Sequence, residues 1–301
     1  MFSLLLVLVV KLPLCRGVED ISVIPLDQPR NTPAYDAEPK RLIHYAAMAY
    51  CSDKSIMQKS CGPCRKIDQT VRFKGIYEFY LNGHALMLVD HQKREVIVAF
   101  RGLTSMVNLK KSLDMKRYNL KAYIFDNSTR IEEARDVRVH RGFKETADSL
   151  RDYILPELKD LFQEHKDYRL QLVGHSLGGA IATLMTIIIH QEMKFLLSRI
   201  SLTTYGQPRV GNYVFAKWFN SLPVTAIRVV NEDDSVPHLP GKWNRFVHIK
   251  SELYITNGVF IPCPPFGKFL EDPQCSSSRS RSFGYSSHLE AWGIPLTTEA
   301  C

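Results

Sequence analysis

Apolar residues along the first half of the chain form two kinds of run. Residues 84 to 90 and 95 to 100 are short and strand-like, and the second run, EVIVAF, is apolar throughout after Glu95. An uninterrupted apolar run of this length predicts a strand covered on both faces. Helical spacing recurs over residues 40 to 50. A second helical stripe, with Pro156 as a predicted kink, is made by Leu150, Ile154, Leu158 and Phe162.

In the second half of the chain, strand-like apolar runs alternate with segments of helical spacing. The pattern predicts strands over residues 169–173, 200–204 and 226–230, and helices over residues 177–197 and 212–219. Strands and helices in alternation favour an α/β architecture, with a mostly parallel sheet covered by helices on both faces. No linker or internal repeat divides the 301 residues, so one large domain is expected.

The N-terminus carries the features of a secretory signal. Residues 2 to 10 are almost unbroken aliphatic, which is too short to span a membrane but typical of a signal-peptide core. Lys11 interrupts this run, and a buried N-terminal strand is the alternative. We expect residues 1–17 to be a signal peptide, residues 18–39 an extended arm, and the mature protein (18–301) to be secreted and extracellular.

Cysteine usage agrees with an oxidising compartment. The chain has seven cysteines, and loss of Cys15 with the signal leaves six: Cys51, Cys61, Cys64, Cys263, Cys275 and Cys301. An even set of six predicts three disulfides. The CGPC at residues 61–64 also matches a thioredoxin-type redox motif, but no suitable helix follows it. A sequon at Asn127 predicts N-glycosylation.

The formal net charge of +8 fits either solubility or contact with an anionic lipid surface. The charges are scattered, which favours solubility. The basic tract at residues 276–282 lacks interleaved aromatic residues, so nucleic-acid binding is not predicted.

The most informative stretch is Gly174-His175-Ser176-Leu177-Gly178, which lies between a predicted strand and a predicted helix. This G-x-S-x-G pattern is the nucleophile elbow, in which glycines permit a tight turn and the serine oxygen is exposed at its tip. The start of a helix also favours a developing oxyanion. A serine N-cap in a glycine-rich turn is the alternative.

A serine nucleophile needs a histidine base and an acid that orients it, which follow it along the chain in this fold. His190 is expected to be packed in a helix and His248 to lie in a strand, which leaves His238 and His288. The loop after strand 226–230 offers three carboxylates: Glu232, Asp233 and Asp234. The residues alone leave both choices open.

Several motifs in order resemble the class 3 lipases, secreted fungal triacylglycerol lipases of the α/β-hydrolase fold with animal relatives, including many from nematodes. These motifs are VIVAFRG (96–102), VHRGF (139–143), GHSLGGAIATL (174–184), TYGQPRVGN (204–212), NEDDSVPHLP (231–240) and HLEAWGI (288–294). The resemblance implies Ser176 as nucleophile, Asp234 as acid and His288 as base, with neither cofactor nor metal. It suggests a nematode-like member.

The same resemblance implies how the cysteines pair. Carried over position by position, it gives Cys51–Cys301, Cys61–Cys64 and Cys263–Cys275. The first of these would join the two ends of the mature domain.

The chain departs from the family at two places. The implied oxyanion donors are the backbone N–H groups of Leu103 and Leu177, but Leu103 replaces a Ser or Thr whose hydroxyl contributes in the fungal enzymes. We expect either Thr104 to supply that hydroxyl or the backbone donors to act alone. The segment at the position of the family's lid has an amphipathic pattern whose apolar face is Met106, Leu109 and Leu113.

These features predict a lipase that acts on acylglycerols at a lipid interface, with transient contact to a membrane or lipid-droplet surface, most simply as a monomer. A phospholipase A1 and a short-chain carboxylesterase share the same chemistry and remain alternatives. A non-catalytic lipid-binding homologue is favoured only by Leu103.

Overall fold

The computed structural model describes residues 36–79, 83–104, 117–119, 136–249, 251–264, 271–279 and 284–301. The expected signal peptide, the lid residues Met106, Leu109 and Leu113, and the sequon at Asn127 lie outside these ranges. Within them, the main sheet has eight strands in the order β1 (Arg72–Phe79), β2 (Gly83–Asp90), β3 (Glu95–Phe100), β6 (Arg169–His175), β7 (Ile200–Tyr205), β9 (Thr225–Asn231), β11 (Ser251–Thr256) and β12 (Val259–Cys263).

The middle of this sheet is parallel. Strands β3, β6, β7, β9 and β11 pair in parallel, whereas β1, β2 and β12 join the edges antiparallel. The predicted α/β-hydrolase fold with a mostly parallel sheet is therefore confirmed. Because the strands are parallel, their carboxyl ends meet at one edge of the sheet, where α/β proteins place their sites.

The apolar run of β3 is buried at every position because its two faces meet two different layers. Val96, Val98 and Phe100 belong to one hydrophobic cluster, and Ile97 and Ala99 belong to the other. Neighbouring β2 alternates in the same way. The uninterrupted apolar run therefore correctly predicts a strand that is covered by a hydrophobic layer on each face.

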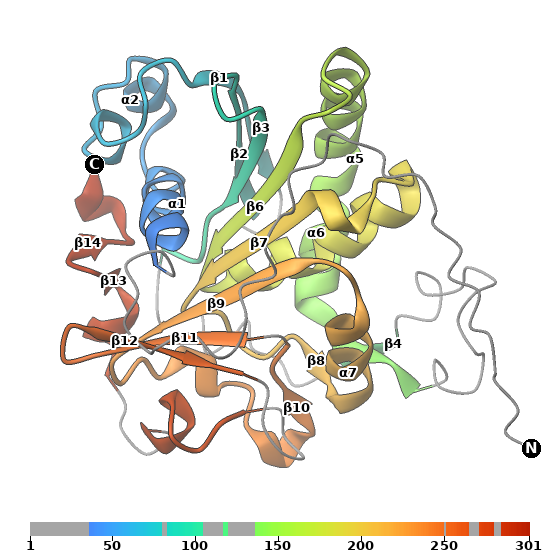
Figure 1. Ribbon diagram of the computed structural model, residues 1–301, viewed down its shortest axis with the longest axis vertical. Coiled ribbons are helices and arrows are strands. Elements are labelled where there is room, and N and C mark those ends of the chain that lie inside the picture. Colours follow the sequence, from blue (N-terminus) through green and yellow to red (C-terminus); the bar gives the residue numbers. More distant parts are fainter. Residues whose placement is uncertain are drawn as a thin grey trace, which may run out of the picture.

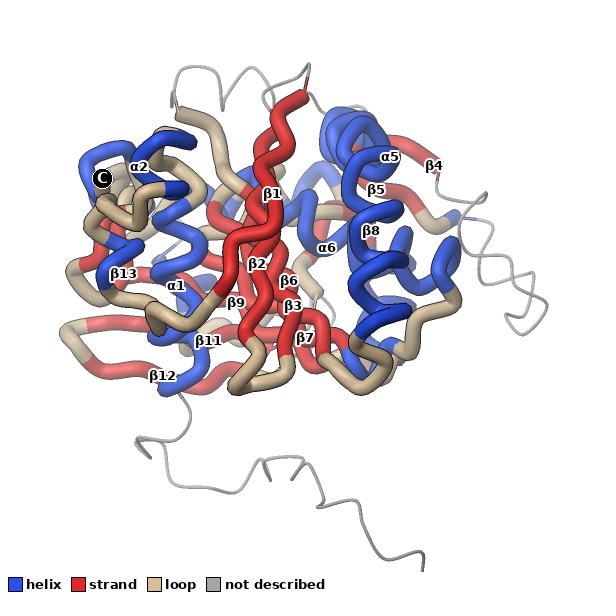
Figure 2. Tube along the Cα trace, turned by 90° about the horizontal axis from the view of Figure 1, so that it is seen from above, coloured by secondary structure: helices blue, strands red, loops and turns tan. Residues whose placement is uncertain are grey.

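Three helices cover one face: α5 (Arg141–Glu164), α6 (Leu177–Met193) and α7 (Tyr213–Ser221). Figure 2 shows the sheet with α5 and α6 on one side and α1 on the other. Helix α6 is buried from Leu177 to Ile189 because it packs against both the sheet and α5. Its apolar character all round follows from this position. No helix among the described residues combines the length and apolarity that a membrane span requires.

The opposite face is covered by α1 (Ala37–Met48) and by the C-terminal segment, which includes β13 (Glu290–Ala291) and β14 (Ile294–Pro295). In Figure 1 the C-terminus lies close to α2 (Asp53–Met57), beside α1. The remaining short strands form a second sheet in the order β10 (Phe246–Val247), β8 (Gly211–Asn212), β5 (Arg138–His140) and β4 (Arg117–Asn119).

Three sequence predictions need correction. Helix α6 ends at Met193 rather than at residue 197, because Lys194 adopts a left-handed backbone conformation with φ of 54°. Asn212 is the N-cap of α7 rather than its first residue, and its side chain accepts a hydrogen bond from the Phe215 N–H. His248 lies just beyond β10 instead of within a strand.

The three disulfides implied by the resemblance are all present in the structure. Cys51–Cys301 closes a sequence separation of 250 residues, Cys263–Cys275 one of 12, and Cys61–Cys64 one of three. The first joins Cys51, in the turn that follows α1, to Cys301, so the C-terminal segment is covalently attached to the α1 region with which it covers the second face. Cys61 and Cys64 are both buried.

Candidate active site

Ser176 stands alone between the end of β6 and the start of α6, with φ of 56° and ψ of −128°. A Cβ added at Gly174 would lie 2.3 Å from the Gly178 carbonyl oxygen. One added at Gly178 would lie 2.1 Å from the Phe100 carbonyl oxygen at the end of β3. Both glycines are therefore required for the turn to pass between strand and helix. The serine sits in a strained conformation of the kind found at nucleophile elbows.

The structure brings Ser176, His288 and Asp234 together. The Nε2 atom of His288 lies 2.9 Å from Ser176 Oγ, and its Nδ1 atom lies 2.9 Å from Asp234 Oδ2. The second carboxylate oxygen of Asp234 accepts a hydrogen bond from the Val236 N–H at 2.9 Å. All three of these side chains are buried. This series of contacts can move a proton from the serine hydroxyl to the imidazole while the carboxylate fixes the ring.

The sequence alone did not decide which of three consecutive carboxylates faces the histidine, and in the structure each of them has a different partner. Glu232 accepts hydrogen bonds from the Thr256 hydroxyl and the Asn257 N–H in the β11–β12 turn. Asp233 accepts one from the Ser287 hydroxyl at 2.5 Å. Asp234 faces the His288 ring. Geometry thus selects the third carboxylate, and the second holds the loop that carries the histidine.

Three other histidines follow Ser176 along the chain, and two of them donate hydrogen bonds to backbone carbonyls. The Nδ1 atom of His190 donates to the Phe195 carbonyl at the end of α6, where the ring is half-buried rather than packed in mid-helix. The Nε2 atom of His248 donates to the Pro237 carbonyl. Burial, followed by the charge of Arg209, lowers the pKa of His238 to about 4, so its ring is neutral at pH 7.

Gly206 provides the space in which the Asp234 carboxylate and the His288 ring meet. This residue follows β7 with φ of +57°, and a Cβ placed on it would lie 2.7 Å from both Asp234 Oδ2 and His288 Nδ1. Sequence reasoning did not single it out, although it stands within the quoted motif TYGQPRVGN. Any larger residue would intrude on the hydrogen bond between carboxylate and imidazole.

We expect Gly206→Ala to lower kcat about 10- to 100-fold, because a small displacement of an orienting group costs rates of this order. Gly258→Ala is the matched control, since Gly258 also has a positive φ of +72° but meets no described atom within 4 Å. Both variants carry the same backbone penalty, of about 1 kcal/mol. Steady-state kinetics alongside thermal unfolding separates the effects, and equal activity in the two variants would contradict the role given to Gly206.

The loop after β3 lies directly against the serine. A Cβ added at Gly102 would approach Ser176 Cβ to 2.7 Å and the His175 carbonyl oxygen to 2.8 Å. Leu103 follows immediately and is partly buried. Leu177 is the first residue of α6, where N–H groups have no acceptor within the helix. Both expected oxyanion donors therefore belong to segments adjoining Ser176. Thr104 is exposed.

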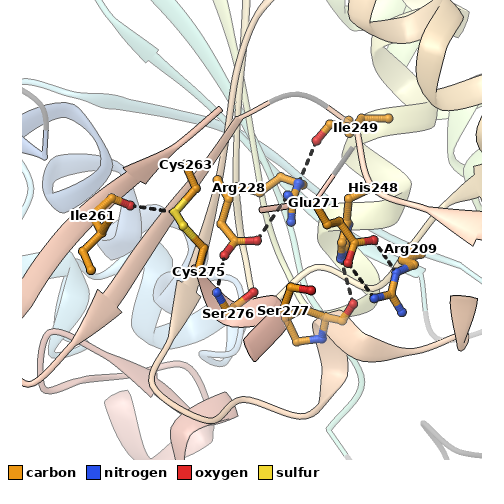
Figure 3. A network of polar contacts seen from close by, with 12 residues as sticks. Arg209, Arg228, His248, Ile249, Ile261, Cys263, Glu271, Cys275, Ser276 and Ser277 are labelled. Carbon is orange, nitrogen blue, oxygen red and sulfur yellow. Dashed lines mark hydrogen bonds and ion pairs between the residues drawn. A yellow bond between two sulfur atoms is a disulfide. The ribbon is translucent and has the colours of Figure 1, made fainter. Parts of the chain in front are cut away.

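A buried ionic network contacts the loop that follows Asp234, and Figure 3 shows its central pair, Arg209 and Glu271, facing each other. The Arg209 guanidinium, which is 2% exposed, donates to both carboxylate oxygens of Glu271, at 2.7 and 2.8 Å. Its third nitrogen donates to the carbonyls of His238 and Pro240. Burial alone would raise the pKa of Glu271, but the hydrogen bonds and charge of Arg209 outweigh it and hold the pKa far below 4.5.

The same network extends to the Cys263–Cys275 disulfide. Arg228 donates to Glu252 at 3.3 Å and to the Ile249 carbonyl at 2.7 Å. The Glu252 carboxylate in turn accepts the N–H of Ser276, next to the disulfide (Figure 3). These ion pairs and hydrogen bonds thereby connect residues of β9, β11 and the segment beginning at Glu271.

The fold and its serine turn place the chain among the proteins with the α/β-hydrolase fold. A family model described as "Lipase (class 3)" matches residues 97–243. A lipase of Rhizomucor miehei is 27% identical over 253 residues, which cover 83% of this chain and 66% of the relative. A secreted alkaline triacylglycerol lipase of Penicillium cyclopium is 25% identical over 233 residues, covering 76% and 77% respectively.

Solved structures agree. One triacylglycerol lipase, whose catalytic centre is formed by a serine protease triad, superimposes with a TM-score of 0.76 at 25% identity, covering 89% of this chain and 98% of that one. The chain is thus similar to the class 3 lipases over residues 97–243, and to fungal lipases over most of its length. It spans 66% and 53% of the lengths of the Rhizomucor miehei and Rhizopus niveus lipases that it matches. These relatives are fungal, so the nematode-like membership stays a prediction.

Proposed function

We propose that this chain is a serine ester hydrolase that cleaves acylglycerols, a triacylglycerol lipase. The observation that carries the proposal is the continuous series of hydrogen bonds from Ser176 Oγ through His288 to Asp234. The similarity to proteins named as lipases supports it, including one named for a serine protease triad.

In the proposed mechanism, His288 Nε2 takes the hydroxyl proton as Ser176 Oγ attacks the ester carbonyl carbon. The tetrahedral intermediate collapses, His288 gives the proton to the departing alcohol, and the acyl group stays on Ser176. Water then enters, His288 takes its proton, and the fatty acid leaves as Ser176 regains its hydrogen. Asp234 keeps the other ring nitrogen protonated and stabilises the imidazolium.

The backbone N–H groups of Leu103 and Leu177 are proposed to bind the oxyanion. Their placement on the segments that adjoin Ser176 supports this assignment. The exposed Thr104 next to Leu103 is the candidate for a side-chain donor.

A lipid interface is the proposed partner, and the surface around His288 supports it. Tyr285 and Leu289 lie within three residues of the base and are 37% and 36% exposed, so two large apolar side chains face solvent beside the site. The segment carrying Met106, Leu109 and Leu113 is proposed as the lid that moves aside on contact with lipid.

Secretion is proposed with residues 1–17 as the signal peptide and Asn127 as a glycan acceptor. The three disulfides are typical of proteins from an oxidising compartment, and one relative is named as a secreted lipase.

A fluorophosphonate probe combined with a substrate panel tests the proposal. The purified protein is treated with the probe in detergent and digested, and the adduct is located by mass spectrometry. Hydrolysis is measured on triolein emulsion, phosphatidylcholine vesicles and soluble p-nitrophenyl butyrate. We expect a single adduct on Ser176 and the fastest turnover on triolein.

Each other outcome selects a different activity. A preference for phosphatidylcholine would make the protein a phospholipase, and turnover of the soluble ester alone would make it a carboxylesterase. Absence of an adduct on folded protein in detergent would reject an ester hydrolase and leave a lipid-binding homologue.

A further inference from the structure

A second series of buried hydrogen bonds runs behind the site through Tyr50 and His175. The His175 Nδ1 atom lies 2.6 Å from Tyr50 Oη, and its Nε2 atom lies 2.9 Å from the backbone carbonyl oxygen of His288. Tyr50 Oη also accepts the Gly102 N–H at 3.0 Å. Tyr50 and His175 are 5% and 2% exposed. None of these groups is used by the proposed chemistry.

Donor and acceptor rules fix the direction of this series. The His288 carbonyl can only accept, so Nε2 of His175 must carry the proton. Burial first, and then the neighbouring His288 ring, hold the pKa of His175 well below 6.5, which keeps its ring neutral. Nδ1 is therefore an acceptor, and the Tyr50 hydroxyl donates to it. Burial also raises the pKa of Tyr50, so this proton is retained.

The series connects three segments whose relative positions matter for the proposed reaction. Gly102 belongs to the loop that carries Leu103, His175 immediately precedes the nucleophile, and the accepting carbonyl belongs to the base itself. A Cβ at Gly102 would lie 2.5 Å from Tyr50 Oη and 2.7 Å from Ser176 Cβ. The tyrosine hydroxyl therefore contacts the loop that carries Gly102 and Leu103, here called the oxyanion loop, at the point where this loop touches the nucleophile.

We propose that Tyr50 and His175 are positioning residues, which set the oxyanion loop and the His288 backbone relative to Ser176 through one ordered series of hydrogen bonds. This role rests on the proposed ester hydrolysis. The Ser176 hydroxyl is hydrogen-bonded to His288 and not to Tyr50 or His175, so these two residues act through other groups. Their loss should lower the rate of the chemical step and leave substrate binding nearly unchanged.

The first test compares two buried tyrosines that differ in what their hydroxyls hold. Tyr50→Phe removes the acceptor of the Gly102 N–H. In Tyr205→Phe, the lost hydroxyl donates to the Pro39 carbonyl on α1. We expect Tyr50→Phe to lower kcat about 10- to 100-fold with KM changed less than about threefold, somewhat below the loss of an oxyanion donor itself. Tyr205→Phe should lose comparable thermal stability and keep kcat. Unchanged kcat in Tyr50→Phe would overturn the proposal.

The second test asks whether the two residues act as one series. His175→Gln keeps an N–H in reach of the His288 carbonyl but removes the ring acceptor. If the series is continuous, the double variant Tyr50→Phe/His175→Gln should be about as slow as the slower single variant. Losses that multiply would show two independent effects and contradict the proposal.

A third test does not depend on catalytic activity. Nitrogen-15 NMR of the wild-type protein should show His175 neutral at pH 7 with its proton on Nε2 and Nδ1 unprotonated. The opposite tautomer would overturn the ordered series. If the wild type fails to hydrolyse any ester, the proposed function fails, and the NMR result still decides whether the hydrogen bonds run as stated.

Discussion

Ser176→Ala is expected to abolish ester hydrolysis, with kcat lowered about 10⁶-fold, because the reaction loses the atom that forms the acyl-enzyme. Among the described residues, the Ser176 hydroxyl has one side-chain hydrogen-bond partner, His288 Nε2, so the variant should fold with little change in thermal stability. Hydrolysis of p-nitrophenyl butyrate, followed with enough enzyme to detect residual turnover, measures the loss. Activity within tenfold of wild type would contradict the assignment of the nucleophile.

The neighbouring carboxylates provide a graded comparison on the same loop. Asp234→Asn should lower kcat about 10⁴-fold, because an amide in place of the carboxylate favours the wrong imidazole tautomer. Asp233→Asn is the control, since its carboxylate faces the Ser287 hydroxyl instead of the ring, and we expect less than about a tenfold loss. Equal losses in the two variants would mean that the acid is wrongly assigned.

The serine turn could be predicted because its glycine spacing, the strand before it and the helix after it all coincide within a few residues. The acid and base could not be selected from the residues alone, since three adjacent carboxylates have the same local context. Their separation depends on side-chain directions around a single turn and on a loop 54 residues away in sequence. Only the resemblance to lipases pointed to Asp234 and His288 beforehand.

The same holds for the fold: local sequence patterns predict the individual elements, but not which distant segments pack against them. The β3 run predicts a strand with two covered faces, and it is one. The pattern says nothing about which segment covers each face, and α1 with the C-terminal residues covers the face opposite α5 and α6. Tyr50 shows the limit most clearly. It follows a helix with no distinguishing motif, and its importance arises from Gly102 and His175, which are distant in sequence.

Arg209→Met is expected to destabilise the protein by about 3–5 kcal/mol, because it leaves Glu271 as an uncompensated buried charge. The side chain of Glu271 is 4% exposed and receives both of its strongest hydrogen bonds from Arg209. Lys242, at 3.1 Å, is partly exposed and compensates only in part. The variant also frees the carbonyls of His238 and Pro240 in the loop that follows Asp234. Urea unfolding at pH 7 measures the loss.

A double variant separates the charge from the carbonyl contacts. Arg209→Met/Glu271→Leu removes both charges, and we expect it to recover about half of the lost stability, since a buried ion pair can be replaced by apolar residues at little net cost. The remainder belongs to the two carbonyls, which stay unpaired. A double variant no more stable than Arg209→Met would assign the whole loss to the carbonyls and contradict the role of the ion pair.

The dependence of stability on pH gives an independent check with a defined sign. The pKa of Glu271 is lower in the folded protein than its ordinary value of 4.5, so its stabilisation is complete above that pH. It is lost progressively as the pH falls below 4.5 towards the folded-state value. In Arg209→Met, Glu271 takes up a proton readily, so this variant should lose less stability in acid. The stability gap between wild type and variant should therefore narrow between pH 7 and pH 3. A gap that stays constant would mean that Arg209 stabilises this loop through its carbonyl contacts and packing, with no contribution from its charge.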